Sequence, residues 1–212
     1  MIETVDIAIT NQCNARCPQC QRTDTNGLGP VPGLPMTTWS LKDFETYFPT
    51  WSLDDFKEYS FCGTWGDPLM AKDIEAICDY ILNNSQANIL ITTNGSIRSK
   101  DFYTRLGNKS GKRLTMIFDI DGVDETMHQK YRRGTSLNKV LNNMLALSRT
   151  DAIVCSQTIL FKHNQHHQKQ IKELATVYGS KNHEFCMSDR FDEDKFYFTN
   201  EDGEQEYLER YE

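Results

Sequence analysis

The stretch VDIAITNQCNARCPQC, residues 5–20, decides the fold because it joins an apolar run to three closely spaced cysteines. The run Val5–Ile9 is rich in β-branched residues, which predicts a β-strand. Cys13, Cys17 and Cys20 follow it in the pattern C-x3-C-x2-C. In parallel α/β folds, the loops at the C-terminal ends of the strands carry the active site. The three cysteines therefore lie where a functional site is expected.

The cysteine pattern indicates metal binding or thiol chemistry. The chain has seven cysteines, an odd number, which argues against a disulfide framework. A structural zinc site needs four ligands, and no second CxxC or nearby HxxxH supplies the fourth. Three thiolates suit a cubane iron-sulfur cluster that leaves one iron for a non-protein ligand. The other four cysteines are isolated and are expected to act as small hydrophobic residues: Cys62, Cys78, Cys155 and Cys186.

Composition limits the class of protein. The 212 residues can bury the core of one domain, and no apolar run approaches the ~20 residues that span a bilayer. The net charge of −7 gives no general attraction to nucleic acid or to an anionic membrane. The N-terminal residues MIETVDIAIT carry acids where a secretory signal carries bases, so we expect a cytoplasmic protein.

Strand and helix patterns alternate along the chain. Segments with helical period separate the apolar runs, and one such face carries Ile74, Ile77, Cys78 and Ile81. This alternation predicts an α/β fold with parallel strands, and the six strand signals are too few for a complete eight-stranded barrel. We therefore expect an incomplete (β/α)6 TIM-like barrel. The predicted strands are Val5–Ile9, Ser60–Trp65, Ala87–Thr92, Leu114–Ile120, Ile153–Phe161 and Glu184–Met187.

Two domains of unequal size are predicted, a partial barrel over residues 1–188 and an acidic tail over 189–212. The tail loses clear periodicity, and we favour a frayed end over a docking arm with aromatic anchors. The Gly- and Pro-rich residues 26–35 predict a loop. Ser40 and Ser52 are expected to cap two short helices.

The cysteine pattern after a first strand resembles the signature of the radical S-adenosylmethionine (radical SAM) enzymes. FCGTWGDPLM resembles the family's GGEP element, with Gly66, Asp67 and Pro68 at its last three positions, although Gly-Asp-Pro also suits an ordinary turn. ITTNGS, with Thr93 and Asn94, resembles a segment of the branch that includes peptide-modifying maturases. A tight turn is the alternative there.

Further segments extend the resemblance and imply cofactor contacts. Asp119 matches a polar position that contacts the cofactor, where a carboxylate can accept the ribose hydroxyls. Arg132 matches an arginine that pairs with the cofactor's carboxylate, and the adjacent Arg133 is the alternative partner. The purely structural alternative for either arginine is an exposed charge at the end of a helix. Gln19 replaces an aromatic residue that packs on adenine, and its amide is expected to hydrogen-bond the base. Asn164 matches a characteristic asparagine or simply caps a helix.

The resemblance implies a mechanism. Cys13, Cys17 and Cys20 are expected to hold a 4Fe-4S cluster whose fourth iron binds S-adenosylmethionine (SAM). An electron from a flavodoxin or ferredoxin then drives the cleavage of SAM to a 5′-deoxyadenosyl radical. This radical abstracts hydrogen from the substrate. A peptide or protein substrate is favoured, and a nucleotide or small metabolite stays open. The alternatives are a non-enzymatic iron-sulfur or zinc protein and a binding module that has lost the chemistry.

Overall fold

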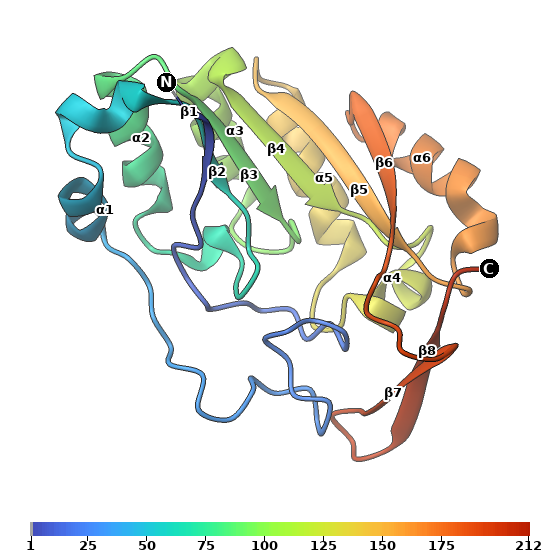
Figure 1. The fold of residues 1–212 in the computed structure, drawn as a ribbon. Helices are drawn as coiled ribbons and strands as arrows, with labels where there is room; N and C mark the ends of the chain where they lie inside the picture. The colour runs from blue at the N-terminus through green and yellow to red at the C-terminus, as the bar shows by residue number, and fades with distance from the viewer. Residues whose placement is uncertain (1) are drawn as a thin grey trace.

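The structure is a computed structural model that describes residues 2–212, so Met1, where the predicted barrel domain begins, lies outside the described residues. Six parallel strands pair in chain order, and the two edge strands do not pair with each other. The result is an open, incomplete (β/α)6 barrel, as predicted (Figure 1). The strands are β1 (Ile2–Asp6), β2 (Phe56–Phe61), β3 (Asn88–Thr93), β4 (Leu114–Asp119), β5 (Ile153–Leu160) and β6 (Asn182–Met187).

Helices cover the outer face of the sheet and leave its inner face open toward the viewer of Figure 1. The face predicted from Ile74, Ile77, Cys78 and Ile81 is completely buried. No helix among residues 2–212 is long and apolar enough to cross a membrane. The α-helices are α1 (Leu41–Tyr47), α2 (Ile74–Asn84), α3 (Lys100–Ser110), α4 (Glu125–Tyr131), α5 (Leu137–Ser148) and α6 (Gln168–Val177). The short 3₁₀ helices are η1 (Thr50–Asp55), η2 (Pro68–Met70), η3 (Gly111–Arg113) and η4 (Gln165–His167).

The first two strands lie closer to the N-terminus than the apolar runs predict. Ile7 and Ile9 are buried, but they follow the end of β1 and lead the chain toward the cysteines. The residues of β1 itself are mostly exposed because it is an edge strand. In this part of the chain the apolar run therefore marks the segment that leads from β1 to the cysteines, and not β1 itself.

The two predicted helix caps have different outcomes. Ser40 caps α1 in a complete capping box, in which the Ser40 hydroxyl accepts from the Asp43 amide and the Asp43 carboxylate accepts from the Ser40 amide. The prediction for Ser52 is wrong, because Ser52 lies inside η1, whose first turn follows Pro49. The Ser52 hydroxyl donates to the Pro49 carbonyl at 2.9 Å.

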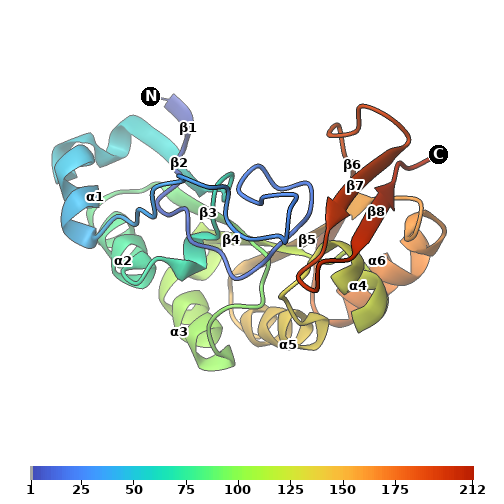
Figure 2. The same cartoon turned by 90° about the horizontal axis from the view of Figure 1, so that it is seen from below.

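The predicted acidic tail is ordered and is not a frayed end. Its residues form an antiparallel hairpin of β7 (Lys195–Thr199) and β8 (Gln205–Glu209). Phe198 and Leu208 are buried against residues of the cysteine loop, defined here as residues 10–40. The hairpin and this loop lie together at the C-terminal edge of the sheet (Figures 1 and 2). The division into domains at residue 188 stays a prediction.

Candidate active site

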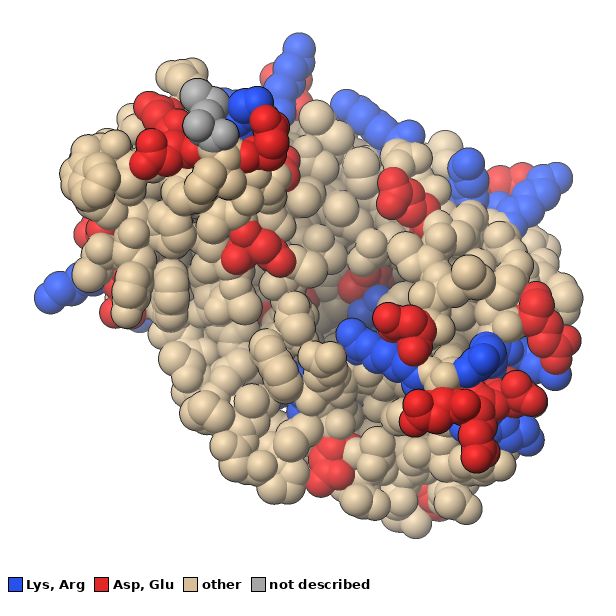
Figure 3. Space-filling view, in the orientation of Figure 1, with Lys and Arg blue, Asp and Glu red and all other residues tan. Residues whose placement is uncertain are grey.

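A cavity of about 280 Å³ lies at the C-terminal edge of the sheet, between the strand ends and the cysteine loop. Figure 3 shows this face hollowed below the sheet, with acidic and basic side chains at the hollow. The cavity brings together most of the predicted site residues, although they come from four strand ends. Those that line it are Cys13, Cys17, Cys20, Gly66, Asp67, Thr93, Asn94, Asp119 and Arg132. Gln19 and Pro68 do not line it.

A close backbone approach fixes the cysteine loop against the end of β2. The Asp67 amide donates to the Gln12 carbonyl at 2.8 Å. A Cβ on Gly66 would lie 2.4 Å from the Thr10 carbonyl oxygen and 2.7 Å from the Asn11 Cα. Only glycine permits this contact.

The three thiols share one cavity in a mostly dry environment. Cys17 is 6% exposed, and Cys13 and Cys20 are partly buried. Burial raises the pKa of the Cys13 thiol to about 11 and the pKa of the Cys17 thiol still further. Three donors face these sulfurs. The Ala15 amide and Asn94 Nδ2 lie 3.3 and 3.7 Å from Cys13 Sγ, and Arg132 Nη1 lies 4.0 Å from Cys17 Sγ.

This donor set fits an iron-sulfur cluster better than a single metal ion. Within residues 2–212, no three His, Cys, Asp or Glu side chains converge on one metal position. In a cubane cluster each cysteine binds a different iron, so the three sulfurs need only line one cavity. Hydrogen bonds to the sulfurs are among the features that tune such clusters.

Asp67 connects the ends of β2 and β3. Its carboxylate accepts hydrogen bonds from the Thr93 hydroxyl at 2.9 and 3.0 Å and from the Asn94 amide at 2.8 Å. It also accepts from the Leu69 amide at 3.0 Å, as the cap of η2. Burial raises the pKa of Asp67 to about 6, although these hydrogen bonds act in the opposite direction. The side chain therefore positions Asn94 beside Cys13.

Asp119 and Arg132 bind each other. Arg132 Nη1 lies 2.9 Å from an Asp119 carboxylate oxygen, and Arg132 Nε donates to Asp121. Asp121 is completely buried, does not line the cavity and was not predicted from the sequence. Gln157 on β5 donates to the second oxygen of Asp119 at 2.8 Å. One arginine thus lies between two carboxylates at the end of β4.

The structure gives Arg133 and Asn164 other roles than those considered from the sequence. Arg133 forms ion pairs with Glu201 and Glu206 and packs over the ring of Phe198, so it points to the hairpin. Asn164 makes no cap hydrogen bond to the helix that follows it. Its amide instead donates to the Asp121 carbonyl at 3.2 Å, which ties the end of β5 to the loop after β4.

Gln19 is engaged by the segment after β6. Its side-chain amide donates to the Arg190 carbonyl at 3.0 Å and accepts from the Ser188 hydroxyl at 2.8 Å. The Gln19 carbonyl accepts from Arg190 Nη1 at 2.7 Å. These three hydrogen bonds are named here the Gln19 clasp, and two of them use the side-chain amide that was expected to face adenine.

Several residues on the cavity were not predicted as site residues. Arg22 and Cys62 come from the cysteine loop and the end of β2, and Tyr131, Gln157 and Arg190 come from later segments. Arg22 and Arg190 carry charge and belong to no recognised motif, so only the folded arrangement places them.

A sequence profile of the Radical SAM superfamily matches residues 7–175. The chain belongs to the radical SAM superfamily. The match includes the three cysteines and the four strand ends that line the cavity. No curated protein sequence matches the chain.

Solved radical SAM structures share the fold at low sequence identity. SuiB from Streptococcus suis, bound to S-adenosylmethionine, is 14% identical with a TM-score of 0.71, and the match covers 88% of this chain and 41% of SuiB. The enzyme anSMEcpe with bound AdoMet is 14% identical with a TM-score of 0.66, covering 88% of this chain and 51% of the other. BtrN in complex with AdoMet and 2-DOIA is 15% identical with a TM-score of 0.52, covering 74% of this chain and 57% of BtrN. The chain thus spans between 41% and 57% of the length of these proteins.

Proposed function

We propose that this radical SAM protein holds a 4Fe-4S cluster with Cys13, Cys17 and Cys20 and cleaves SAM reductively to begin hydrogen abstraction from a substrate. The observation that carries the proposal is the shared cavity, where three thiols of one loop meet the ends of β2, β3 and β4. The profile match over these elements and the solved relatives with bound SAM support it. With cluster and SAM bound, the cofactor pair supplies the radical chemistry.

The residues of the chain hold and enclose the reactants. Asp67 and Thr93 fix Asn94 beside Cys13, and Asp119 with Arg132 forms a charged wall at the end of β4. Backbone groups of Gly66 to Pro68 face or flank the same cavity, and we propose that this segment contacts the methionyl part of SAM. Burial of Cys17 beneath the hairpin excludes water from part of the site.

We propose a peptide or protein as the substrate. One structure of SuiB is bound to the precursor peptide SuiA, and one structure of anSMEcpe holds a Cp18Cys peptide. The face of the molecule that carries the inner side of the open sheet is hollowed at the cavity (Figure 3), and a large ligand docked there would cover the site. A low-potential donor such as a flavodoxin or ferredoxin, and a cytoplasmic location, stay predictions.

Iron and cofactor analyses test the proposal. Anaerobically reconstituted protein should contain about four irons and matching sulfide, and dithionite should release 5′-deoxyadenosine from SAM. Cys13→Ala, Cys17→Ala and Cys20→Ala should each abolish the cluster, whereas Cys78→Ala, in the buried face of α2, should keep it. Tightly bound zinc without iron would favour the zinc alternative. Iron without SAM cleavage, alone and with candidate peptides, would favour a non-enzymatic iron-sulfur protein.

A further inference from the structure

A second cavity, of about 240 Å³, lies between the start of the cysteine loop, the end of that loop and the segment that follows β2. None of the residues that line it carries a charged side chain, and two of them are tryptophans from distant parts of the sequence. We name it the tryptophan pocket. The lining residues that carry the argument are Ile9, Asn11, Leu34, Thr37, Trp39 and Trp65.

Backbone pairing builds one wall of the tryptophan pocket. The Trp39 amide donates to the Ile9 carbonyl at 2.8 Å. The Asn11 amide donates to the Thr37 carbonyl at 3.1 Å, and the Asn11 side chain accepts from the Thr37 amide at 2.7 Å. Trp39 is held from behind, because its ring stacks on that of Tyr47 with centroids 5.0 Å apart and packs against the core. This wall is therefore formed before any ligand binds.

Trp65 forms another wall and is free to contact a ligand. It stands at the first position of the segment that resembles GGEP, where that motif has glycine. Its side chain lines the tryptophan pocket and not the cavity of the candidate active site. It is 39% exposed, although tryptophan side chains are highly buried on average. An exposed indole on a formed pocket indicates a contact site, since tryptophan is enriched where proteins bind their partners.

The tryptophan pocket and the cavity of the candidate active site share a wall. Gly66, the residue after Trp65, lines that cavity. It lies against the backbone of Thr10 and Asn11, which line the tryptophan pocket. A ligand in the pocket therefore lies next to the proposed chemistry. The pocket is smaller than the ~300–1,000 Å³ of sites that hold whole small molecules, so it fits one side chain of a larger ligand.

Asp6 sets the charge beside the pocket. Asp6 and Ala8 are exposed whereas Ile7 and Ile9 are buried, so Asp6 and Ala8 share one face of the chain. Ala8 lines the pocket, and Asp6 lies roughly 7 Å from it along the extended chain. The Asp6 carboxylate accepts from the Ser60 hydroxyl at 3.1 Å, and the ion pairs among residues 2–212 do not include it. A basic group is favoured beside the pocket and an acidic group is repelled.

We propose that the tryptophan pocket binds an aromatic side chain of a peptide substrate, with a basic residue of the same peptide beside Asp6. This inference rests on the proposed function, because it takes the peptide of that proposal as the occupant. The uncharged walls exclude a charged side chain, which would lose its water without gaining a partner. An aromatic ring fits best, because it packs on indoles in offset or edge-to-face geometry.

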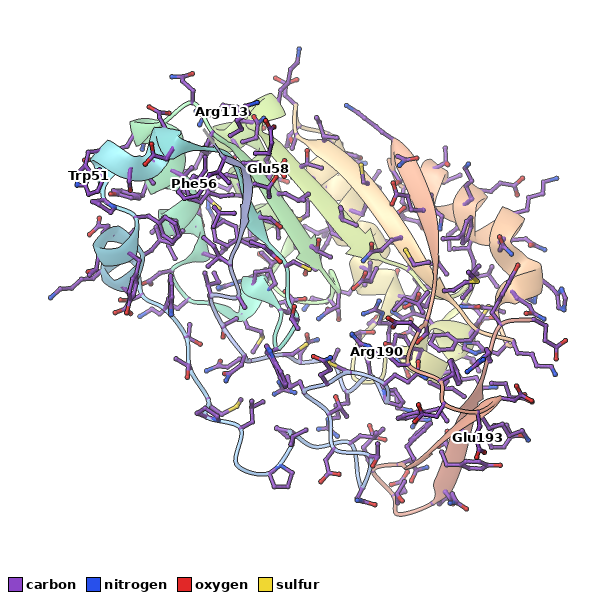
Figure 4. The ribbon with its side chains drawn as sticks, viewed as in Figure 1. Trp51, Phe56, Glu58, Arg113, Arg190 and Glu193 are labelled. Atoms are coloured by element: carbon purple, nitrogen blue, oxygen red, sulfur yellow. The ribbon has the colours of Figure 1, made fainter. Side chains whose placement is uncertain are left out.

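Tryptophan fluorescence of the metal-free 212-residue chain tests the pocket, since an iron-sulfur cluster would quench the emission. The chain has three tryptophans, and Trp51 is 82% exposed in η1, outside the pocket. In Figure 4 Trp51 lies at the edge of the molecule, away from the cysteine loop. Trp51→Phe therefore leaves the two pocket indoles as the only reporters. N-acetyl-Phe-Lys-amide should shift their emission in a saturable manner, whereas N-acetyl-Ala-Lys-amide should not, and N-acetyl-Phe-Glu-amide should bind more weakly.

Two further substitutions, made in the Trp51→Phe protein, test the two walls of the argument. Trp65→Ala should weaken the binding of N-acetyl-Phe-Lys-amide about tenfold or more, as truncation of a central tryptophan does in other interfaces. Asp6→Asn keeps an acceptor for Ser60 and should remove the preference for lysine over glutamate. Trp51→Phe is itself the matched control, because calorimetry should give it the same dipeptide affinity as the wild type. Circular dichroism checks that each variant is folded.

The outcomes separate this inference from the proposed function. Equal emission changes with the phenylalanine and alanine dipeptides, or unchanged affinity in folded Trp65→Ala protein, would overturn the pocket. In reconstituted protein with SAM, saturating N-acetyl-Phe-Lys-amide should change the rate of 5′-deoxyadenosine formation, and Trp65→Ala should abolish the change. A wild-type rate that does not respond would overturn the role in substrate binding. If the wild-type protein takes up neither iron nor SAM, the proposed function fails, and the fluorescence titration still decides whether the pocket binds an aromatic side chain.

Discussion

Gly66 shows how a single residue controls the geometry of the cysteine loop. The Thr10 carbonyl and the Asn11 Cα lie where a side chain would begin. Both neighbours are backbone atoms, which cannot rotate away as a flexible side chain can. The approach of the loop to β2 therefore depends on the absence of one carbon atom.

We expect Gly66→Ala to displace the cysteine loop and reduce iron binding, with a loss of about 1–3 kcal/mol in the free energy of unfolding. Iron analysis after reconstitution and urea denaturation measure the two effects. Gly29→Ala is the control, since an added Cβ there meets nothing within 4 Å and lies in the same loop. Wild-type iron content in Gly66→Ala would show that the loop tolerates the displacement.

Asp119 and Arg132 should respond differently to removal. Arg132→Ala leaves two buried carboxylates unpaired and should cost about 3–5 kcal/mol in the free energy of unfolding, whereas Asp119→Ala leaves Arg132 paired with Asp121 and should cost less. Because the family resemblance implies that Asp119 contacts SAM, its loss should weaken SAM binding about tenfold to a hundredfold and leave the iron content intact. Urea denaturation and calorimetry measure these effects. Unchanged SAM affinity in Asp119→Ala would place the cofactor elsewhere.

The positions of the candidate residues on the cavity were predictable where a motif carries them. The cysteines, Asp67 and Asn94 follow predicted strands, and parallel strands bring their C-terminal ends to one edge. Asp121 and Arg190 have no such pattern. Asp121 is recognisable only from the contact with Arg132, which lies eleven residues later on another element.

At the scale of elements, the hairpin of β7 and β8 joins distant parts of the chain. Thr199 exchanges backbone hydrogen bonds with Thr25 and Gly27 of the cysteine loop at 2.7 and 2.9 Å. Arg133, which follows α4, binds Glu201 and Glu206 of the hairpin. The hairpin therefore connects α4 to the loop that carries Cys17.

Breaking these ion pairs should expose Cys17. In metal-free protein, Arg133→Gln should speed the labelling of Cys17 by a thiol reagent severalfold, because the hairpin opens more often. Mass spectrometry of labelled peptides measures the rate at each cysteine. The swap Arg133→Glu with Glu206→Arg should restore slow labelling.

Lys162 provides the control for this experiment. It pairs with Glu212 at 2.6 Å, but both side chains are largely exposed, so Lys162→Gln should change the labelling little. Equal labelling of Cys17 in the wild type and in Arg133→Gln would mean that these ion pairs do not hold the hairpin closed.

The sequence predicted most of the sheet well. The last four strands were found within two residues at each end. The apolar runs of β3, β4 and β5 are part of the core, whereas β6 is an edge strand whose Cys186 and Met187 are exposed. The hairpin was missed because its acidic composition suggested a frayed tail. Of its residues, Phe198 and Leu208 are those buried on the cysteine loop, too few for a period to show in the sequence.

At the scale of the whole molecule, two buried histidines couple stability to pH. His128 is completely buried and accepts from the Asp121 amide at 3.2 Å. His183 is buried between β5 and the outer helices, where it contacts Ser156 and Thr158. Burial lowers the pKa of both imidazoles to about 4.

Because the pKa values of these histidines are lowered, they make the free energy of unfolding fall as the pH falls. The folded pKa lies below the unfolded value near 6.5, so the unfolded chain binds protons first as the pH falls from about 6.5 to 4. Each histidine then lowers the free energy of unfolding by up to ~1.4 kcal/mol per pH unit. Asp67, with its pKa raised to about 6, acts in the opposite direction as the pH falls from 6 to about 4. Burial also lowers the pKa of His163 to about 4 and raises the pKa of Asp119, so His163 acts as the two buried histidines do and Asp119 acts as Asp67 does. The three histidines outweigh the two aspartates.

We therefore expect a lower free energy of unfolding at pH 5 than at pH 7, measured by urea denaturation at both values. His183→Gln should reduce this difference, because it removes one of the three histidines whose pKa is lowered. A pH difference as large in His183→Gln as in the wild type would assign the effect to other residues.

The covering of Cys17 by the hairpin has a consequence for biogenesis. Translation adds β7 about 175 residues after Cys20, which at ~5–20 residues per second takes roughly 9 to 35 s. During that interval the nascent chain already contains all three cysteines, while the segment that buries Cys17 does not yet exist. Iron and sulfide can be delivered in this window without any opening of the finished fold, and a ribosome-bound chain stalled before residue 190 should accept a cluster more readily than the mature apoprotein.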